Sequence, residues 1–423
     1  MPDQIEIQPT GPLRASIRPP GSKSITNRAL VCAALSEGPS ILTGALDSED
    51  TGVMVAALQH LGLEVAHDPD ASTIKVIGTG GELPNERADL NIANSGTTIR
   101  FLTAMLAACR GDFRLDGIAR MRERPIADLL MALNQLGGSA TSENSDGCPP
   151  VLIAANGLRG GIATIRGNIS SQFLSGLLMA APYSRQSAVI KVDGELVSKP
   201  YVTMTLGVMA AFGIDVRTSS LDEFVLPSAR YKGSNYDIEP DASAASYFWG
   251  AAAVTGGTVA VEGLHRNALQ GDVTFCDCLA RMGCEVDYAE NYIKVTGSSL
   301  RGITIDMNAI SDTAQTLAVV ALFADGPTTI TGVAHIRHKE TDRIGDLARE
   351  LRKLGAKVVE FEDGMTITPQ PLQTAMIDTY NDHRMAMSFA IAGLKSPGVV
   401  INDPNCTRKT YPHFFDDLDR LAS

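Results

Sequence analysis

The motif that decides the fold lies near the N-terminus and reads Pro19-Pro20-Gly21-Ser22-Lys23-Ser24-Ile25-Thr26-Asn27-Arg28. A strand-like segment, Arg14 to Arg18, precedes it, and an apolar helical run, Ala29 to Leu35, follows. The first residues of a helix carry unpaired N–H groups and the positive end of the helix dipole, so such a turn attracts anions. Lys23 and Arg28 add two positive charges, which favours a phosphate or carboxylate ligand. For this loop alone, a Ser/Thr cap beside two solvated cations is an equally good interpretation.

The same construction, a short strand followed by a polar loop and a helix rich in Ala, Leu and Met, occurs six times. Its loops are marked by Lys23, Gly96, Ser171, Ser243, Asp312 and Asp382. These landmarks are 73, 75, 72, 69 and 70 residues apart, a step too regular for chance and longer than solenoid periods. A second pattern places a glycine after a helix and before a strand, as at Leu58–Gly62 and Leu279–Gly283. Together the patterns predict six βαβαββ-like units.

Six units divide most simply into two domains of three. The sixth unit reaches the end of the chain without its last strands, and the N-terminal strands can replace them, so both termini belong to one domain. Pro19-Pro20 and Glu239-Pro240 suit the two crossings, or hinges, because proline stiffens the chain. We predict an α/β (α+β) fold with a discontinuous domain, residues 1–19 plus 240–423, and an inserted domain, residues 20–239. The small, apolar helices should be buried, with their polar N-terminal loops facing a cleft between the domains.

Composition excludes several classes of protein. The chain has 423 residues, 44% hydrophobic and 20% charged, as expected of a globular protein. The net charge of −12 argues against general nucleic-acid binding, although not against a small anionic ligand. Seven scattered cysteines without a CxxC pair predict no metal site. Neither a signal-peptide pattern nor an apolar run of about 18 residues occurs, so we expect a protein that does not span a membrane and that is either cytoplasmic or targeted by a segment outside this sequence.

Cations stand close to many of the six loops. They are Lys23, Arg28, Arg100, Arg124, Lys339, Arg343, Arg384 and Lys409. This number suggests a ligand with more than one anionic group. Each motif taken alone has a simpler explanation: Arg124 in a solvated helix start, Lys339 to Arg343 as a surface helix with internal ion pairs, and Asp382 as a helix cap. The joint arrangement is what these explanations do not account for.

Neutral and acidic side chains complete the candidate site. Ser170-Ser171-Gln172 and Ser198-Lys199-Pro200-Tyr201 offer hydroxyl and amide groups to a sugar-like ring or a phosphate. Asp312 is an acid in a loop otherwise suited to anions, so it is either a general base or an N-cap. The glycine-lysine step of an ATP-binding loop is missing, as are a Gly-x-Ser-x-Gly elbow and a His-Glu-x-x-His motif. An ATP-dependent kinase is therefore disfavoured.

Eight motifs then point to one family. They are Pro20–Arg28, Asn94–Arg100, Arg120–Pro125, Ser170–Phe173, Ser198–Tyr201, Lys339–Arg343, Asp382–Met385 and Lys409–Pro412. These motifs occur in the order and with the spacing of the 5-enolpyruvylshikimate-3-phosphate (EPSP) synthase family, which the chain resembles along its whole length. The resemblance implies two domains of three βαβαββ units (an inside-out α/β barrel) and transfer of the enolpyruvyl group of phosphoenolpyruvate to the 5-hydroxyl of shikimate 3-phosphate. Such an enzyme serves the shikimate pathway to chorismate and the aromatic amino acids and is a target of glyphosate.

The resemblance also implies a role for each matching residue. Shikimate 3-phosphate would be held by Lys23, Ser24, Arg28, Ser170, Ser171, Gln172, Ser198, Tyr201, Asp312 and Lys339. Phosphoenolpyruvate would be held by Lys23, Gly96, Arg124, Gln172, Arg343, Arg384 and Lys409. Asp312 would take the hydroxyl proton, and Glu340 or Lys23 would protonate the methylene carbon to give a tetrahedral intermediate. No metal or organic cofactor is implied; we expect a monomer whose domains close on the substrates.

Two departures and two alternatives accompany the resemblance. His335 stands where the family commonly has asparagine, and Phe101 stands where proline or leucine is more usual. Gly96 favours sensitivity to glyphosate, because alanine would crowd that position. The sister family that acts on UDP-N-acetylglucosamine is disfavoured, since Ser24 follows Lys23 and no cysteine occurs in Arg120–Pro125. A catalytically silent anion-binding module is disfavoured because two acids are kept beside the cations.

Overall fold

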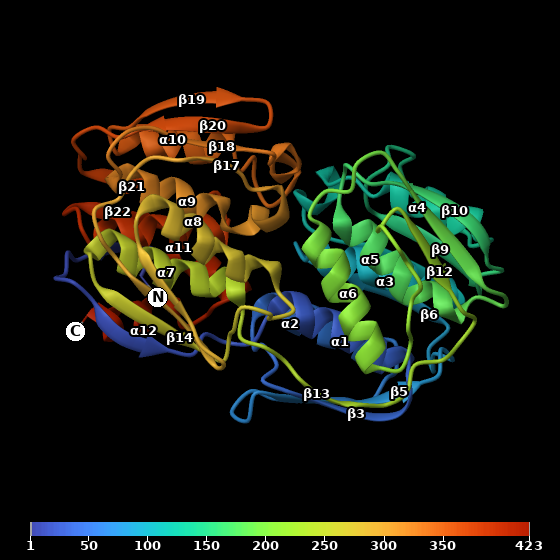
Figure 1. Ribbon diagram of the computed structural model, residues 1–423. Helices are drawn as coiled ribbons and strands as arrows, with labels where there is room; N and C mark the ends of the chain where they lie inside the picture. The colour runs from blue at the N-terminus through green and yellow to red at the C-terminus, as the bar shows by residue number, and fades with distance from the viewer. Residues whose placement is uncertain (1, 423) are drawn as a thin grey trace. The chain divides into compact units, whose positions relative to one another are not determined.

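The computed structural model describes residues 2–422 and divides the chain into two compact units (Figure 1). Unit 1 comprises the residues up to Pro20 together with those from Glu239 onward. Unit 2 comprises Gly21–Ile238. The chain therefore passes between the units twice, and both described ends lie in unit 1.

Unit 2 contains six α-helices and three sheets. The helices are α1 (Lys23–Leu35), α2 (Glu49–His60), α3 (Gly96–Ala108), α4 (Ala127–Gln135), α5 (Ser171–Ala180) and α6 (Lys199–Ala211), with 3₁₀ turns η1 (Met121–Glu123) and η2 (Ala181–Tyr183). The strands are β3 (Glu37–Thr43), β4 (Val65–Asp68), β5 (Thr73–Thr79), β6 (Arg87–Asn91), β7 (Arg110–Asp116), β8 (Ala140–Ser142), β9 (Val151–Asn156), β10 (Gly161–Arg166), β11 (Ala188–Asp193), β12 (Glu223–Leu226) and β13 (Asn235–Asp237).

Unit 1 repeats this plan. Its helices are α7 (Ala242–Thr255), α8 (Phe275–Met282), α9 (Ala314–Val320), α10 (Gly345–Lys353), α11 (His383–Gly393) and α12 (Phe414–Ala422), with 3₁₀ turns η3 (Gly271–Thr274), η4 (Asn308–Thr313), η5 (Ala321–Phe323), η6 (Ala334–His338) and η7 (Pro404–Lys409). Its strands are β1 (Gln4–Ile7), β2 (Arg14–Ile17), β14 (Thr258–Glu262), β15 (Glu285–Tyr288), β16 (Tyr292–Thr296), β17 (Thr304–Asp306), β18 (Thr328–Thr331), β19 (Lys357–Phe361), β20 (Gly364–Thr368), β21 (Ala375–Ile377) and β22 (Val399–Asn402).

The sheets show the duplication directly. Four of them have the same plan, with one parallel pair followed by two antiparallel pairs: β13-β3-β5-β4, β6-β7-β9-β8, β2-β14-β16-β15 and β17-β18-β20-β19. The N-terminal strands complete sheets formed by the C-terminal half, since β1 runs antiparallel to β22 and β2 runs parallel to β14. The predicted α/β class is confirmed, although the six sheets among the described residues stay separate and do not join into a closed barrel.

The central helices of each unit are buried because they lack a polar face. Every residue of α7 and α11 is buried, as is every residue of α3. In unit 1, α7, α9 and α11 pack against one another, and in unit 2, α1 packs on α3 and α6 while α3 packs on α5 (Figure 1). Helices that are apolar on all sides are stable only inside a core. Their N-terminal ends are therefore the places where polar side chains can gather without disrupting that core.

Two absences bear on the sequence-based expectations. No helix among the described residues is long and apolar enough to cross a membrane. Within residues 2–422, no group of three His, Cys, Asp or Glu side chains is placed to hold a metal ion. All seven cysteines are free thiols, and six of them are buried.

Candidate active site

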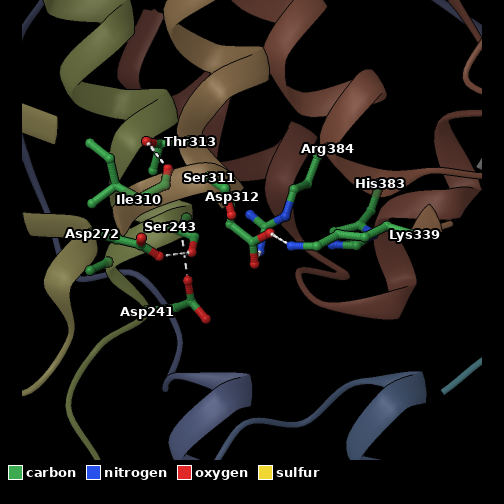
Figure 2. Close-up of polar contacts among 12 residues, drawn as sticks. Asp241, Ser243, Asp272, Ile310, Ser311, Asp312, Thr313, Lys339, His383 and Arg384 are labelled. Carbon is green, nitrogen blue, oxygen red and sulfur yellow. Dashed lines mark hydrogen bonds and ion pairs between the residues drawn. The ribbon is translucent and has the colours of Figure 1, made fainter. Parts of the chain in front are cut away.

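In unit 1, three cations converge on the carboxylate of Asp312. Lys339 Nζ lies 2.5 Å and Arg343 Nη1 3.2 Å from its Oδ1, and Arg384 Nη2 lies 2.8 Å from its Oδ2. Figure 2 shows Lys339 and Arg384 pointing at this carboxylate from different elements. Asp312 belongs to η4 and makes no helix-capping hydrogen bond, because α9 begins at Ala314 without a side-chain cap. The N-cap interpretation of Asp312 is therefore wrong.

Glu340 is the second acid of this group. Its Oε1 lies 2.8 Å from Lys409 Nζ, and its Oε2 lies 2.8 Å from Arg343 Nη2. The side chain of Glu340 is only 8% exposed. Because Arg343 also contacts Asp312, one guanidinium bridges both acids. The interpretation of Lys339 to Arg343 as an exposed surface helix is wrong, since Arg343 is buried and two of its partners lie outside the motif.

Asp382 fixes the guanidinium that links the two acids. Arg343 donates to it twice, from Nε to Oδ2 at 2.6 Å and from Nη2 to Oδ1 at 3.1 Å. Such a paired contact sets the plane of a guanidinium as well as its position. Asp382 also caps α11, where its carboxylate accepts from the N–H of Arg384 at 2.9 Å. The cap expected from the sequence is thus present, and the same side chain clamps Arg343.

The cluster keeps a positive charge even though its acids are paired. Four cations (Lys339, Arg343, Arg384, Lys409) face three carboxylates (Asp312, Glu340, Asp382), which leaves one net positive charge. Burial alone raises the pKa of the Asp312 carboxyl, but Arg384, Lys339 and Arg343 outweigh burial and hold this pKa well below its usual range. Asp312 is therefore ionised, and its charge is neutralised by groups that also suit an anionic ligand.

A neutral histidine stands beside this acid. His335 Nε2 lies 3.0 Å from the hydroxyl of Ser311, the residue before Asp312. Burial, together with the charge of Lys339, lowers the pKa of His335 to about 3. The imidazole therefore stays uncharged at neutral pH and offers a hydrogen bond rather than a further positive charge.

In unit 2, Arg28 is buried among hydroxyls and carbonyls. Its Nε donates to Thr205 Oγ1 at 2.7 Å, and its Nη2 donates to Ser175 Oγ at 3.1 Å and to the carbonyl of Tyr201 at 3.2 Å. Its Nη1 donates to the carbonyl of Ser24 at 2.9 Å. Burial lowers the pKa of Arg28 to about 10, so it remains charged at neutral pH. Arg28 thus joins α1, α5 and α6 and holds two predicted ligand residues, Ser24 and Tyr201.

Gly96, the first residue of α3, lies under two guanidinium groups. A Cβ built there would lie 2.3 Å from Arg124 Nη2 and 2.7 Å from Arg100 Nη1, so only glycine fits without displacing them. Arg100 Nη1 donates to the carbonyl of Gly96 at 3.0 Å and to Gln172 Oε1 at 3.2 Å. Arg124 lies near Asn94 and is only 5% exposed, so the interpretation of Arg124 as part of a solvated helix start is wrong.

The remaining unit 2 residues lie at helix starts. Lys23 is the first residue of α1, and Ser171 is the first residue of α5. Ser170 caps α5 by accepting from the N–H of Gln172 at 3.3 Å. Ser198 precedes α6 with φ of 53°, a left-handed conformation that few non-glycine residues adopt. These positions put hydroxyl, amide and backbone N–H donors at the ends where the helix dipoles favour anions.

Comparisons with known proteins agree with this arrangement. The sequence model of EPSP synthase (3-phosphoshikimate 1-carboxyvinyltransferase) matches residues 7–418. The chain belongs to the EPSP synthase family. It is 48% identical to 3-phosphoshikimate 1-carboxyvinyltransferase of Nostoc punctiforme, with 98% of each chain covered, and 45% identical to that of Marinomonas sp., with 100% of each covered.

Solved structures agree as well. The EPSP synthase of Acinetobacter baumannii superposes with a TM-score of 0.82 at 27% identity, over 99% of this chain and 98% of that one. The enolpyruvyl transferase NikO of Streptomyces tendae gives a TM-score of 0.77 at 19% identity, over 98% and 96% of the two chains, which shows a shared fold alone.

The structure connects six of the predicted residues in unit 1 and two smaller groups of them in unit 2. In unit 1, Asp312, Lys339, Glu340, Arg343, Arg384 and Lys409 form one connected ion network. In unit 2, Ser24, Arg28 and Tyr201 are linked, and Gly96 is linked to Gln172 through Arg100.

Some residues that shape the site were missed by the sequence analysis. Ser175 and Thr205 hold Arg28, and Tyr247 accepts from Arg384 Nη1 at 3.3 Å. These lie 147, 177 and 137 residues from the arginines that they contact, inside otherwise apolar helices. The sequence could have indicated these residues, because a hydroxyl that stands alone in an apolar helix becomes buried and then needs a hydrogen-bond partner.

Proposed function

We propose that this chain transfers the enolpyruvyl group of phosphoenolpyruvate to the 5-hydroxyl of shikimate 3-phosphate, with the ion network around Arg343 as its proton-transfer centre. Membership of the EPSP synthase family supports the reaction itself. One observation supports the assignment of roles: a single buried guanidinium contacts both candidate acids, Asp312 and Glu340. The two acids are therefore held as a pair beside cations suited to phosphate and carboxylate.

Asp312 is the proposed base for the 5-hydroxyl proton. Without ligand its three cations make it a weak base, because they stabilise the carboxylate. Anionic groups of the substrates that bind Lys339, Arg343 and Arg384 draw these charges away. The basicity of Asp312 then rises at the moment when the hydroxyl is in place.

Glu340, or Lys23, is the proposed acid for the methylene carbon of phosphoenolpyruvate. The proton goes to that carbon, the shikimate oxygen bonds to the neighbouring C2, and a tetrahedral intermediate forms. Return of the proton restores the double bond as the C2–O bond to phosphate breaks. Fixed cations neutralise the charge that moves during these steps, so the proposed mechanism uses no metal or organic cofactor.

The proposed substrate-binding residues form two sets, one for each substrate. For shikimate 3-phosphate we propose Lys23, Ser24, Arg28, Ser170, Ser171, Gln172, Ser198, Tyr201, Asp312 and Lys339. For phosphoenolpyruvate we propose Lys23, Gly96, Arg124, Gln172, Arg343, Arg384 and Lys409. Most N–H donors of Arg28 already bond to the protein, so its main proposed role is to hold Ser24 and Tyr201 in place. The chain is proposed to act in the cytoplasm. It is also proposed to be a monomer, and light scattering after size-exclusion chromatography would test this oligomeric state.

The decisive experiment is an assay of phosphate release from phosphoenolpyruvate. Release is expected when shikimate 3-phosphate is present, and no release is expected with phosphoenolpyruvate alone. UDP-N-acetylglucosamine serves as the matched control acceptor and should give none. Release that does not depend on shikimate 3-phosphate, or that proceeds with the UDP sugar, would overturn the proposed function.

A further inference from the structure

A hollow lies in unit 2 at the end opposite the proposed substrate loops. Its volume is about 470 Å³, within the range of small-molecule sites. Ala108 and Cys109, where α3 ends, form part of its wall. Gly96 begins the same helix, 13 residues long, so at 1.5 Å per residue the hollow is roughly 20 Å from that loop.

All three repeats of unit 2 contribute to the hollow, and each supplies a charged group. The second supplies Arg110, and the third supplies Arg185 and Arg230. The first supplies Glu82 and Glu86. Three arginines against two glutamates leave one net positive charge.

The arginines are not neutralised by the protein. Within residues 2–422, no carboxylate lies within the 4.0 Å ion-pair distance of any of the three, although Glu82 and Glu86 line the same hollow. The guanidinium of Arg110 makes no hydrogen bond to any of residues 2–422. A guanidinium has five N–H donors, so most donors around the hollow stay available to a ligand.

Two of the arginines are held in place before any ligand binds. Arg185 Nη2 donates to the carbonyl of Asn156 at 2.9 Å. Arg230 Nη1 donates to the carbonyl of Gly80 at 2.6 Å, and its guanidinium lies 4.6 Å from the ring centre of Tyr183. Because these side chains are already restrained, a ligand pays a smaller entropic cost for ordering them when it binds.

The wall of the hollow also depends on a glycine. Gly81 has φ of +89°, and a Cβ there would lie 2.7 Å from Tyr183 Cδ1 and 2.9 Å from Arg230 Nη1. The loop thus approaches the aromatic ring and the guanidinium as closely as the backbone allows. The tyrosine hydroxyl is anchored on the carbonyl of Leu35, the last residue of α1.

We propose that this hollow is a second binding site, separate from the active site, for a small organic or inorganic anion with at least two negative charges. Arginine binds carboxylate and phosphate groups through paired hydrogen bonds, and three guanidiniums around one hollow suit a ligand with several such groups. The site does not depend on the proposed catalytic roles, because it shares none of their residues.

The test is equilibrium dialysis of the full-length protein against labelled citrate and, separately, labelled inorganic phosphate at matched ionic strength. The test variant is Arg110→Gln/Arg185→Gln, and the control is Arg159→Gln, an exposed arginine of the same unit that does not line the hollow. The active-site cations are the same in all three proteins, so differences report on the hollow. Circular dichroism and phosphate release, which should be unchanged, verify folding.

The wild type and the control should bind one more equivalent of anion per chain than the double variant, whose affinity for that equivalent should fall about tenfold or more. Binding of citrate alone would identify carboxylates as the ligand groups. Binding of phosphate alone would identify a phosphoryl group, and binding of both would show that charge decides. Equal binding of both anions by all three proteins would overturn the proposal.

Discussion

The polar helix ends of the two units handle charge in different ways. In unit 1, Asp312, Glu340 and Asp382 pair with four cations, so the charges are largely balanced inside the protein. In unit 2, Arg28 bonds only to neutral hydroxyls and carbonyls, and the partners described for Arg100 and Arg124 are also neutral. Neutral partners orient a guanidinium without cancelling its charge.

From this difference we expect unit 1 to carry out proton transfer and unit 2 mainly to bind anions. Paired acids in unit 1 can gain and lose protons as ligands compete for their cations, which is what proton transfer requires. Cations held by neutral groups in unit 2 keep their attraction for external anions, which is what binding requires. Substitutions in unit 1 should therefore lower kcat, while those in unit 2 should mainly raise KM.

The largest effect is expected from removing the proposed base. Asp312→Asn keeps the size of the side chain but cannot accept the hydroxyl proton, and kcat should fall about 10²- to 10⁴-fold. Phosphate release at saturating substrates measures the loss. The matched control is Asp287→Asn, which changes an exposed carboxylate of unit 1 that pairs with Lys294. A near-normal kcat for Asp312→Asn would show that Asp312 is not the base for the 5-hydroxyl proton.

A smaller loss is expected when the clamp on Arg343 is weakened. Asp382→Asn retains a side chain that caps α11, because asparagine is as good an N-cap as aspartate, but it loses the charge that holds Arg343. We expect kcat to fall about 10- to 100-fold with little change in melting temperature.

A double-mutant cycle distinguishes the clamp from a purely structural role. Asp382→Asn and Arg343→Lys should not be additive in kcat, since either change breaks the same paired contact. Additive losses in kcat, or a large fall in melting temperature for Asp382→Asn alone, would show that Asp382 acts by stabilising the fold.

Gly96→Ala tests the unit 2 side of the comparison. The new methyl group would displace the ends of Arg124 and Arg100, which are flexible, so the fold should tolerate it. We expect KM for phosphoenolpyruvate to rise about tenfold, and inhibition by glyphosate to weaken, with kcat changed much less. Ser175→Ala, which removes one partner of Arg28, is the companion variant and should act on shikimate 3-phosphate instead. A fall confined to kcat would contradict the division of work.

The sequence predicted the fold through its repeat rather than through individual elements. The step of about 70 residues, and the glycine that recurs between a helix and the next strand, locate the units, and four of the six sheets among the described residues share one strand order. Lys23 and Arg28 lie within the first two turns of α1, a largely buried helix. A buried helix normally excludes a charged residue such as Arg28, and here Thr205 and Ser175 supply the neutral partners that make its burial possible.

The sequence names candidate site residues but not the contacts between them. Sequence motifs indicate Asp312, Glu340 and Arg343, yet the sequence alone does not show that the guanidinium of Arg343 contacts both acids. Asp382 was interpreted as a cap because capping is local, whereas its contact with Arg343 spans 39 residues. Long-range ion pairs depend on the packing of separate elements, which local patterns do not encode.

The smallest effect concerns pH and also separates the units. His335 has its pKa lowered to about 3 from an ordinary 6.5, so the folded state resists the protonation that the unfolded chain accepts. The contribution of this neutral imidazole to stability is full above pH 6.5 and is lost as pH falls toward 3, by up to ~2 kcal/mol at pH 5. In unit 2, Arg28, whose pKa is lowered by burial to about 10, stays charged throughout this range. His335→Asn should therefore flatten the decline in unfolding free energy between pH 7 and 5, measured by urea denaturation. An unchanged slope would mean that His335 is solvated or already charged in the folded protein, and that the acid sensitivity arises elsewhere.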